Sequence, residues 1–492
     1  YYDRFDQKEG WIAESWEWSV DSANEEGTVV YQIRQGINFA LNPDSEASVL
    51  VGGRAMTMDD VLFSLKQMIT DDRAYIYRAN PELRGADIVQ TGDWEISITL
   101  PLKDLYVGLG RFGNYGRVVP PEVVEEYGDM ANWKNSVGTG PFMVTDFMPA
   151  SEATLVRNPN YWGKDPVGPG KGNQLPYIDG YKYLIIPDSS TRLAAIRTGK
   201  LDQIVSLSWE DASALKSQVP DLKELKVIGG NLPSISMAGN QQPYSDVRVR
   251  RALMMATDFE QINETMQNGQ GQILSWPYAY SETYADLYLG LDDPDIPASI
   301  AELYVYSPEK AKQLLADAGY PNGFQTTAII TAVEADYYSV IKDMWAKVGV
   351  EVELDVRERG GWAGVFRAKK QEAIGYYPQG PTSMWYTGIS IMGPGAVNAS
   401  FIDDPVINET MADIRIALVT EGEAVGLKMY REMLKHVLDQ AYTIPGVTGI
   451  SSHFWWPWIK NYSGEYSVGF AFLNNWVKWV WVDQDLKKEM GY

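Results

Sequence analysis

The chain has no cysteine and only two histidines among its 492 residues. Without cysteine it forms no disulfides and has neither thiolate metal ligands nor cysteine nucleophiles. The two histidines do not form a cluster in the sequence. His436 falls in an apparent helix, and His453 stands beside Phe454. We expect both to be structural. The sequence therefore predicts no soft-metal site and no cofactor.

The short motifs that carry catalysis or phosphate binding are also missing. There is no GxxxxGK[ST] phosphate loop, no HExxH zinc motif and no GxSxG nucleophile elbow. Asp and Glu together number 65, so some pair will stand at a glycosidase spacing by accident, and this gives an enzymatic interpretation little weight. The acidic stretch DDPD at residues 292–295 lacks the spacing of a calcium loop, and we expect a solvated turn there.

Long apolar runs are absent as well. No stretch reaches the ~18 apolar residues that a membrane-spanning helix needs. The formal net charge of −23 repels nucleic-acid phosphates and anionic lipid headgroups, so a nucleic-acid partner is not expected. No signal peptide stands at the start, and we interpret Tyr1 as lying inside a longer, exported precursor.

What the chain does have is length and aromatic residues. A chain of 492 residues predicts two or three domains. Its 17 Trp and 30 Tyr exceed what core packing favours, because buried indole N–H and phenol O–H groups need partners. We expect most of them to be ordinary half-buried residues and a minority to contact a ligand.

Strand and helix patterns alternate along the chain. Period-two alternation predicts a strand over residues 27–39, and TMDD at residues 57–60 predicts a capping box that starts a helix. Asp246 is expected to cap another helix, and Ser307 with Pro308 to start a third. This alternation predicts an α/β fold with mixed sheets.

Several sequence blocks occur in a fixed order over some 300 residues. They are AESW at 13–16 with YQIRQGINF at 31–39 and DDVLFS at 59–64, VGTGPF at 137–142 with RNPNYW at 157–162, IPDSSTR at 186–192 with GKLD at 199–202, NQQPYSDVRVRRAL at 240–253, and YSPEKAKQLL at 306–315 with AGYPNGF at 318–324. In these blocks the sequence resembles the family 5 extracytoplasmic solute-binding proteins of ABC importers, which handle peptides, nickel chelates and oligosaccharides. It departs from them where ALNPDS at 40–45 replaces the usual HDG.

The resemblance implies a bilobal periplasmic-binding-protein type II fold with an enlarged N-terminal lobe. Lobe 1 would comprise residues 1–236, with an inserted subdomain at about 13–147, and would be completed by 454–492. Lobe 2 would comprise residues 237–453. The resemblance further implies a monomer, periplasmic or lipid-anchored outside the cytoplasmic membrane, that closes on a small-molecule ligand in its cleft and delivers it to permease subunits.

The same resemblance places certain aromatic and amide side chains where the family binds ligand. The expected ligand-binding residues are Trp209, Trp276, Trp362, Tyr376, Tyr377, Gln379, Trp385, Asn114, Asn398 and Trp455. Trp209 is expected from lobe 1, and Trp276, Trp362 and Trp385 from lobe 2. Three arginines, Arg248, Arg250 and Arg251, would suit an anion site, but in the family their motif is a helix start that stabilises lobe 2.

The ligand class depends on one missing acid. In peptide binders the matching loop carries an Asp that pairs with the ammonium of the peptide, whereas residues 377–379 here read YPQ. A buried ammonium without a counter-charge is strongly disfavoured. Sugar rings stack on Trp and Tyr, and their hydroxyls suit Gln379, Asn398 and Asn114. We therefore expect an oligosaccharide, with two alternatives: a peptide bound through another acid, or a glycosidase on a similar scaffold.

Overall fold

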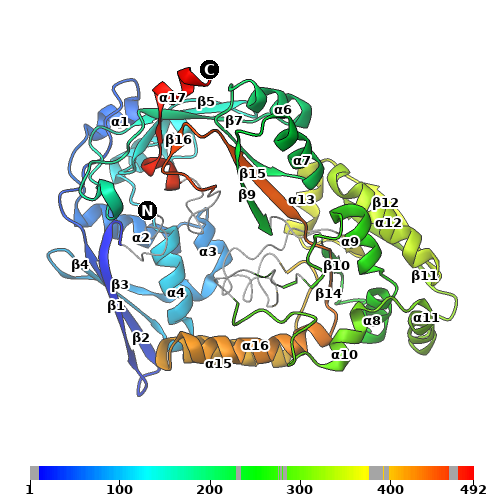
Figure 1. Cartoon of the computed structure of the whole chain (residues 1–492). Coiled ribbons are helices and arrows are strands. Elements are labelled where there is room, and N and C mark those ends of the chain that lie inside the picture. Colours follow the sequence, from blue (N-terminus) through cyan, green and yellow to red (C-terminus); the bar gives the residue numbers. More distant parts are fainter. Residues whose placement is uncertain are drawn as a thin grey trace. The chain divides into compact units, whose positions relative to one another are not determined.

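The computed structural model of the chain describes residues 10–228, 234–274, 276–277, 280, 285–375, 392, 398–464 and 475–492 (Figure 1). The chain forms two compact units. Unit 1 consists of Tyr1–Val205, Ser213–Leu225 and His453–Tyr492, and unit 2 consists of Ser206–Ala212 and Lys226–Ser452. Within the described residues, no helix has both the length and the apolar character that crossing a membrane requires.

An antiparallel sheet of four strands, in the order β1-β2-β4-β3, opens unit 1. Its strands are β1 (Ala13–Asp21), β2 (Glu26–Ile33), β3 (Asp87–Gly92) and β4 (Glu95–Pro101). Helix α4 (Leu102–Tyr115) packs on β2 and β4. The approach is close, because a Cβ added at Gly108 would stand 2.3 Å from Cδ1 of Leu100. Glycine at this position therefore lets the helix lie on the sheet.

The remaining elements of unit 1 are shorter. The sheet β5-β6-β7 is antiparallel, and β16 pairs with β17. These strands and the helices around them are β5 (Phe142–Met148), β6 (Glu152–Arg157), β7 (Gly180–Leu184), β16 (Ile459–Lys460), β17 (Trp481–Val482), α1 (Glu46–Val51), α2 (Met58–Thr70), α3 (Tyr75–Ala79), α5 (Pro121–Tyr127), α6 (Ser189–Arg197) and α17 (Gln484–Glu489), with 3₁₀ turns η2 (Pro81–Gly85), η3 (Trp133–Asn135), η4 (Gly168–Gly170) and η8 (Asn475–Trp479).

The chain passes between the two units in a small group of elements. They are β8 (Gln203–Leu207), α7 (Trp209–Gln218), β9 (Lys223–Ile228) and β15 (Ile450–Trp455). The three strands form one sheet in the order β8-β15-β9.

Unit 2 is built on a mixed sheet of five strands in the order β12-β11-β13-β10-β14. β11 pairs in parallel with β12 and β13, whereas β10 pairs antiparallel with β13 and β14. The strands are β10 (Ser234–Met237), β11 (Phe324–Ile330), β12 (Val350–Val356), β13 (Ile374–Gly375) and β14 (Thr443–Pro445). This mixture of parallel and antiparallel pairs, joined by helices, confirms the predicted α/β class.

Helices follow these strands in sequence. They are α8 (Val247–Met255), α9 (Phe259–Gln267), α10 (Ala298–Ala301), α11 (Pro308–Asp317), α12 (Ala335–Ala346), α13 (Arg359–Arg367), α15 (Pro405–Thr420) and α16 (Glu423–Asp439), with 3₁₀ turns η6 (Glu302–Tyr304) and η7 (Ala332–Glu334). Helices α15 and α16 lie side by side as a hairpin (Figure 1).

The predicted helix starts are confirmed and one strand is corrected. Thr57 and Asp60 form the capping box of α2, and the Asp246 side chain accepts from the N–H of Arg248 at the start of α8. The strand predicted over residues 27–39 ends at Ile33, because Gly36 takes a left-handed conformation with φ of 74°.

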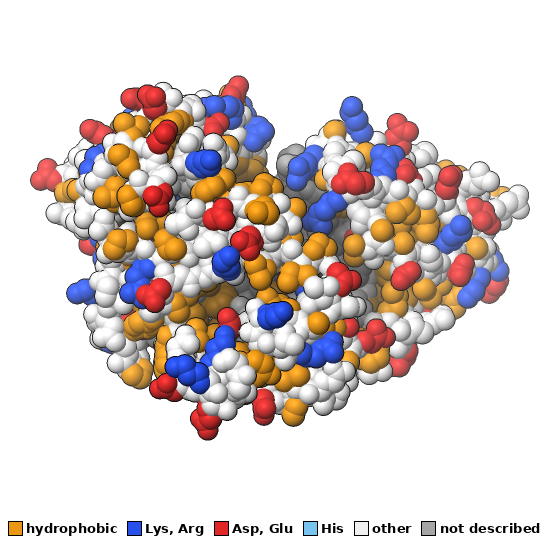
Figure 2. Space-filling view, turned by 90° about the horizontal axis from the view of Figure 1, so that it is seen from above, with side chains coloured by type: hydrophobic (Ala, Val, Ile, Leu, Met, Phe, Trp, Pro, Cys, Tyr) orange, Lys and Arg blue, Asp and Glu red, His pale blue; other side chains and the backbone are white. Residues whose placement is uncertain are grey.

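Charged side chains of both signs are spread over one face of the molecule. On the face seen in Figure 2, Asp and Glu side chains are interspersed with Lys and Arg and with patches of hydrophobic side chains. The charge of −23 therefore does not arise from a single acidic field on that face.

Candidate functional site

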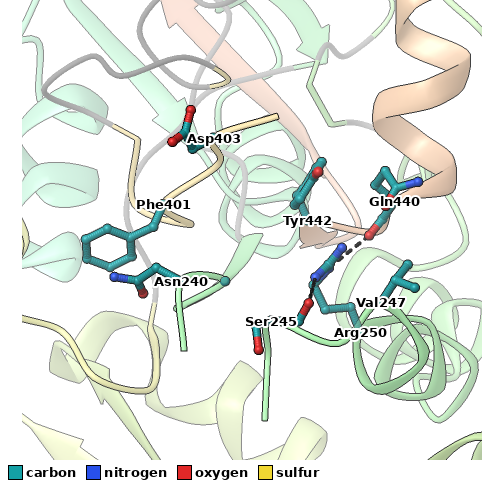
Figure 3. Close-up of a pocket in the computed structure, with 9 residues that line it drawn as sticks. Asn240, Ser245, Val247, Arg250, Phe401, Asp403, Gln440 and Tyr442 are labelled. Atoms are coloured by element: carbon teal, nitrogen blue, oxygen red, sulfur yellow. Dashed lines mark hydrogen bonds between the residues drawn. The ribbon is translucent and has the colours of Figure 1, made fainter. Parts of the chain in front are cut away.

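A pocket of about 510 Å³ lies within unit 2 (Figure 3). Four short segments line it: the turn after β10, the start of α8, the turn before α15, and the link between α16 and β14. The lining residues are Gly239, Asn240, Ser245, Val247, Arg250, Phe401, Asp403, Gln440 and Tyr442.

Arg250 is the buried cation of this pocket, with 4% of its surface exposed. Its Nε donates to the carbonyl of Gln440 at 2.9 Å, and its Nη1 donates to the carbonyl of Tyr244 at 2.8 Å. These bonds join the start of α8 to the end of α16, which agrees with the structural role expected of this arginine. Burial lowers the pKa of Arg250, and the nearby Tyr442 and the carboxylates of Asp246 and Asp404 act against that shift.

Tyr442 forms the wall beside that cation. Its ring centroid lies 4.7 Å from the guanidinium carbon of Arg250, which is a cation–π distance. Its hydroxyl donates to Oδ2 of Asp404 at 2.7 Å. Burial and the bond to Asp404 both raise the pKa of Tyr442, so the phenol stays protonated and keeps donating.

The turn before α15 is held by its own side chains. The amide of Asn398 bonds Ile402 twice, because its Nδ2 donates to the Ile402 carbonyl at 2.7 Å and its Oδ1 accepts from the Ile402 N–H at 2.9 Å. Phe401 takes a left-handed conformation with φ of 53° inside this turn. Asn398 was expected to bind ligand, and that role stays a prediction.

The other predicted site residues that the structure describes are distributed over both units, and none of them lines the described pocket. Trp276 is 1% exposed, and Trp362 is 5% exposed and packs on Phe366 with 5.6 Å between ring centroids. Trp455 is 5% exposed, and its indole Nε1 has no acceptor within the described residues.

Trp209 and Asn114 are more accessible. Trp209 is half-buried at the start of α7, and Ser206–Ala212 groups with unit 2, whereas we expected this tryptophan from lobe 1. Asn114 is exposed near the end of α4. Four further predicted residues lie outside the described part of the chain: Tyr376, Tyr377, Gln379 and Trp385.

The acidic stretch and the histidines have protein partners. Asp293 pairs with Arg431, whose Nη2 also lies 3.9 Å from Oδ2 of Asp295. His436 places Nε2 2.7 Å from Oδ2 of Asp404, and His453 is buried with Nδ1 3.1 Å from the carbonyl of Gly464. Over the described ranges, no group of three or more His, Asp or Glu side chains is arranged to hold a metal ion.

Sequence reasoning did not assign Asn240, Tyr442 or Asp403 to a site. These residues come from three segments that are far apart in sequence. One signal in the sequence could have indicated this pocket. Arg250 occupies a buried position of α8, as do Val249 and Ala252. A charged residue on the buried face of a helix requires partners or a ligand.

Comparisons with known proteins cover most of the chain. Residues 8–391 match the family described as bacterial extracellular solute-binding proteins, family 5 Middle. Heme-binding protein A of Haemophilus influenzae is 27% identical over 397 residues, which is 72% of this chain and 65% of that protein. The glutathione-binding protein GsiB of Salmonella typhimurium is 24% identical over 478 residues, which is 90% of this chain and 82% of that protein.

Solved structures share the fold at low identity. The periplasmic binding protein DppA of Helicobacter pylori, in complex with the peptide STSA, matches with a TM-score of 0.75 at 21% identity, over 96% of this chain and 89% of that one. The oligopeptide-binding protein AppA of Bacillus subtilis, in complex with a nonapeptide, matches with a TM-score of 0.74 at 18% identity, over 96% and 90%. These matches confirm the predicted periplasmic-binding-protein type II fold.

Proposed function

Because the chain belongs to family 5 of the bacterial extracellular solute-binding proteins, we propose that it captures a short peptide for its ABC importer. Proteins of this family are extracytoplasmic binding proteins of transport systems and not enzymes, so the glycosidase alternative is set aside. A monomeric state and a lipid anchor stay predictions.

The observation that carries the proposal is the cargo of the relatives. A relative that aligns with 90% of this chain is a glutathione-binding protein, and both structural matches described above hold peptides. Glutathione is itself a small peptide. We therefore prefer a peptide to the oligosaccharide that the aromatic content and the missing acid favoured.

The pocket of unit 2 supports the same choice. Asn240, Ser245 and Gln440 offer amide and hydroxyl groups that suit peptide bonds. Asp403 is an exposed carboxylate on the pocket lining, and its Oδ1 accepts from Nδ2 of Asn408 at 3.0 Å. We propose that this carboxylate pairs with the ammonium of a peptide. An acid elsewhere in the chain is what the peptide alternative requires.

An oligosaccharide remains the second candidate, because the segment at residues 377–379 has no acid and the chain is rich in Trp and Tyr. Calorimetric titration separates the two. The panel consists of peptides of two to five residues, their N-acetylated forms, and β-linked oligosaccharides of two to five units. We expect free peptides to bind and the sugars to give no heat of binding.

A matched pair of variants adds a test of Asp403. Asp403→Asn should lower the affinity for free peptides by about tenfold and leave the affinity for N-acetylated peptides unchanged. The reason is that only a free ammonium makes a charged hydrogen bond to this carboxylate. Asp413→Asn, at an exposed position of α15, serves as the control and should bind like the parent. Binding of a sugar together with no response to any peptide would overturn the proposal.

A further inference from the structure

The side-chain amide of Gln267, the last residue of α9, lies against the backbone of Gly449. A Cβ built at Gly449 would stand 2.7 Å from Cδ of Gln267 and closer still to its Oε1, so a side chain at this position would displace the amide. Gly449 does not take a left-handed conformation, so its backbone does not require glycine. Glycine at 449 therefore serves to leave room for the amide of Gln267.

The amide of Gln267 is not used by the protein itself. Neither its oxygen nor its nitrogen makes a hydrogen bond to any residue that the structure describes. Gln272 differs, because its Oε1 accepts from the N–H of Tyr280 at 3.0 Å. Gln267 is half-buried, and a side-chain amide offers one acceptor oxygen and two N–H donors. These groups are therefore available to a ligand.

Two hydroxyl groups at the same edge of the unit 2 sheet also lack partners. Oγ1 of Thr448 and Oγ of Ser234 belong to residues that are 1% and 0% exposed, and neither makes a hydrogen bond within the described ranges. Ser234 begins β10 opposite Pro445, which ends β14, so the start of one strand and the end of the other share this edge. A buried hydroxyl without a partner costs about 1–3 kcal/mol. Its position favours a polar ligand, or a water bound with one, at this edge.

We infer that Gln267 binds the backbone of the peptide, with its Oε1 accepting from the N–H and its Nε2 donating to the carbonyl of one extended residue. The N–H and carbonyl of an extended residue point to the same side, as they do along a strand, so one primary amide can meet both. An ammonium offers only donors and a carboxylate only acceptors, so either would leave half of the amide unpaired. The inference rests on the proposed function, but it does not depend on the pairing of Asp403.

The test is a double-mutant cycle between the protein and tetraalanine. The probes are tetraalanine and its three depsipeptides, in each of which an ester oxygen replaces one peptide N–H. By calorimetry, one of the three esters should bind the parent at least tenfold more weakly than tetraalanine, because it cannot donate to Oε1 of Gln267. In Gln267→Met, which keeps the length of the side chain and lacks the amide, the same ester should bind within twofold of tetraalanine.

A second variant tests the placement of the amide without changing Gln267. The methyl group of Gly449→Ala would push the amide away, so this variant should bind tetraalanine at least fivefold more weakly, even if Gln267→Met fails to fold. Gln261→Met makes the same change at an exposed position of α9, and Gly85→Ala adds a methyl group where nothing lies within 4 Å. Both controls should bind tetraalanine like the parent, and thermal melts confirm that each variant is folded.

The outcomes separate this inference from the proposed function. Equal losses for every ester in the parent and in a folded Gln267→Met variant overturn the inference, as does parent-like binding of tetraalanine by Gly449→Ala. Binding of other tetrapeptides without binding of tetraalanine also overturns it, because recognition of the backbone does not need larger side chains. These results leave the peptide proposal standing. A parent protein that binds sugars and no peptide refutes the proposed function, and this inference with it.

Discussion

The hydroxyl of Tyr442 donates a hydrogen bond of 2.7 Å to Oδ2 of Asp404, 38 residues earlier in the chain. The same oxygen lies 2.7 Å from Nε2 of His436, and the other oxygen accepts from the N–H of Val406 as the N-cap of α15. One carboxylate thus joins the start of α15, the helix α16 and the wall of the pocket beside Arg250.

Replacing Asp404 by Ala should therefore lower the free energy of unfolding by about 2–4 kcal/mol, because a helix cap and two further hydrogen bonds are lost together. Chemical denaturation measures the change. Asp413→Ala, at an exposed position of the same helix, should cost less than about 0.5 kcal/mol. Equal costs for the two variants would mean that the Asp404 network does not stabilise unit 2.

Acid should destabilise unit 1 through a second carboxylate network. Arg54 donates to Asp60 at 2.7 Å and to Glu122 at 2.7 Å. Burial raises the pKa of Asp60, but hydrogen bonds from Arg54 and Thr57 outweigh it, so the pKa is lowered. The hydrogen bond from Arg54 likewise lowers the pKa of Glu122.

Because both carboxyls have lowered pKa values in the folded state, the unfolded chain binds protons first as the pH falls. The stabilisation that these two carboxylates contribute is complete above their pKa values in the unfolded chain, which are about 4. It is lost as the pH falls through their pKa values in the folded state. We expect the melting temperature to fall between about pH 5 and pH 3. Arg54→Met should be less stable at pH 7 and show a shallower fall. Lys66→Met, at an exposed position, is the control. If the melting temperature of Arg54→Met falls with pH as steeply as that of Lys66→Met, the Arg54 network is not the cause of the acid destabilisation.

Two tryptophans expected to bind ligand should behave differently when they are replaced by Ala. Trp362 is buried against Phe366, so Trp362→Ala should lower the free energy of unfolding by about 3–5 kcal/mol. Trp209 is half-buried, and its proposed stacking on a ligand stays a prediction. If Trp209→Ala removes about 2 kcal/mol of stacking energy, the affinity for the ligand should fall roughly thirtyfold. Parent-like titrations of Trp209→Ala would remove this residue from the site.

Tyr492 should contribute to the stability of unit 1. Its ring lies 4.6 Å from that of Trp456 and 5.2 Å from that of Trp458, and its hydroxyl donates to the carbonyl of Arg197 at 3.2 Å. Tyr492→Ala should lower the free energy of unfolding by about 1–2 kcal/mol, whereas Tyr492→Phe should retain most of it, because the ring contacts remain. Denaturation of both variants provides the comparison, and equal losses would show that the rings contribute little.

Local signals predicted the fold well. The capping box at Thr57 and the cap at Asp246 involve residues at most three positions apart, so the sequence contains the whole interaction. The strand predicted through Phe39 was wrong beyond Ile33. The alternation of apolar and polar residues continues past Gly36, but the left-handed backbone of that glycine does not continue a strand.

The candidate site depends on contacts that no local pattern contains. The bond from Arg250 to Gln440 joins residues 190 positions apart, and the motif around Arg250 favoured a structural helix start over an anion site. Asn398 has the chemistry of a ligand-binding amide, and its side chain also makes two hydrogen bonds to the nearby backbone of Ile402. Residue type alone cannot distinguish an amide used by its own turn from one offered to a ligand.

Native mass spectrometry of the protein after incubation with a mixture of casein hydrolysate and β-linked oligosaccharides tests the central claim most directly. Both ligand classes then compete for the same binding protein, and the bound mass is released and fragmented. The account predicts adducts that fragment as short peptides with free termini. Adducts spaced by sugar units, with no peptide retained, would contradict it.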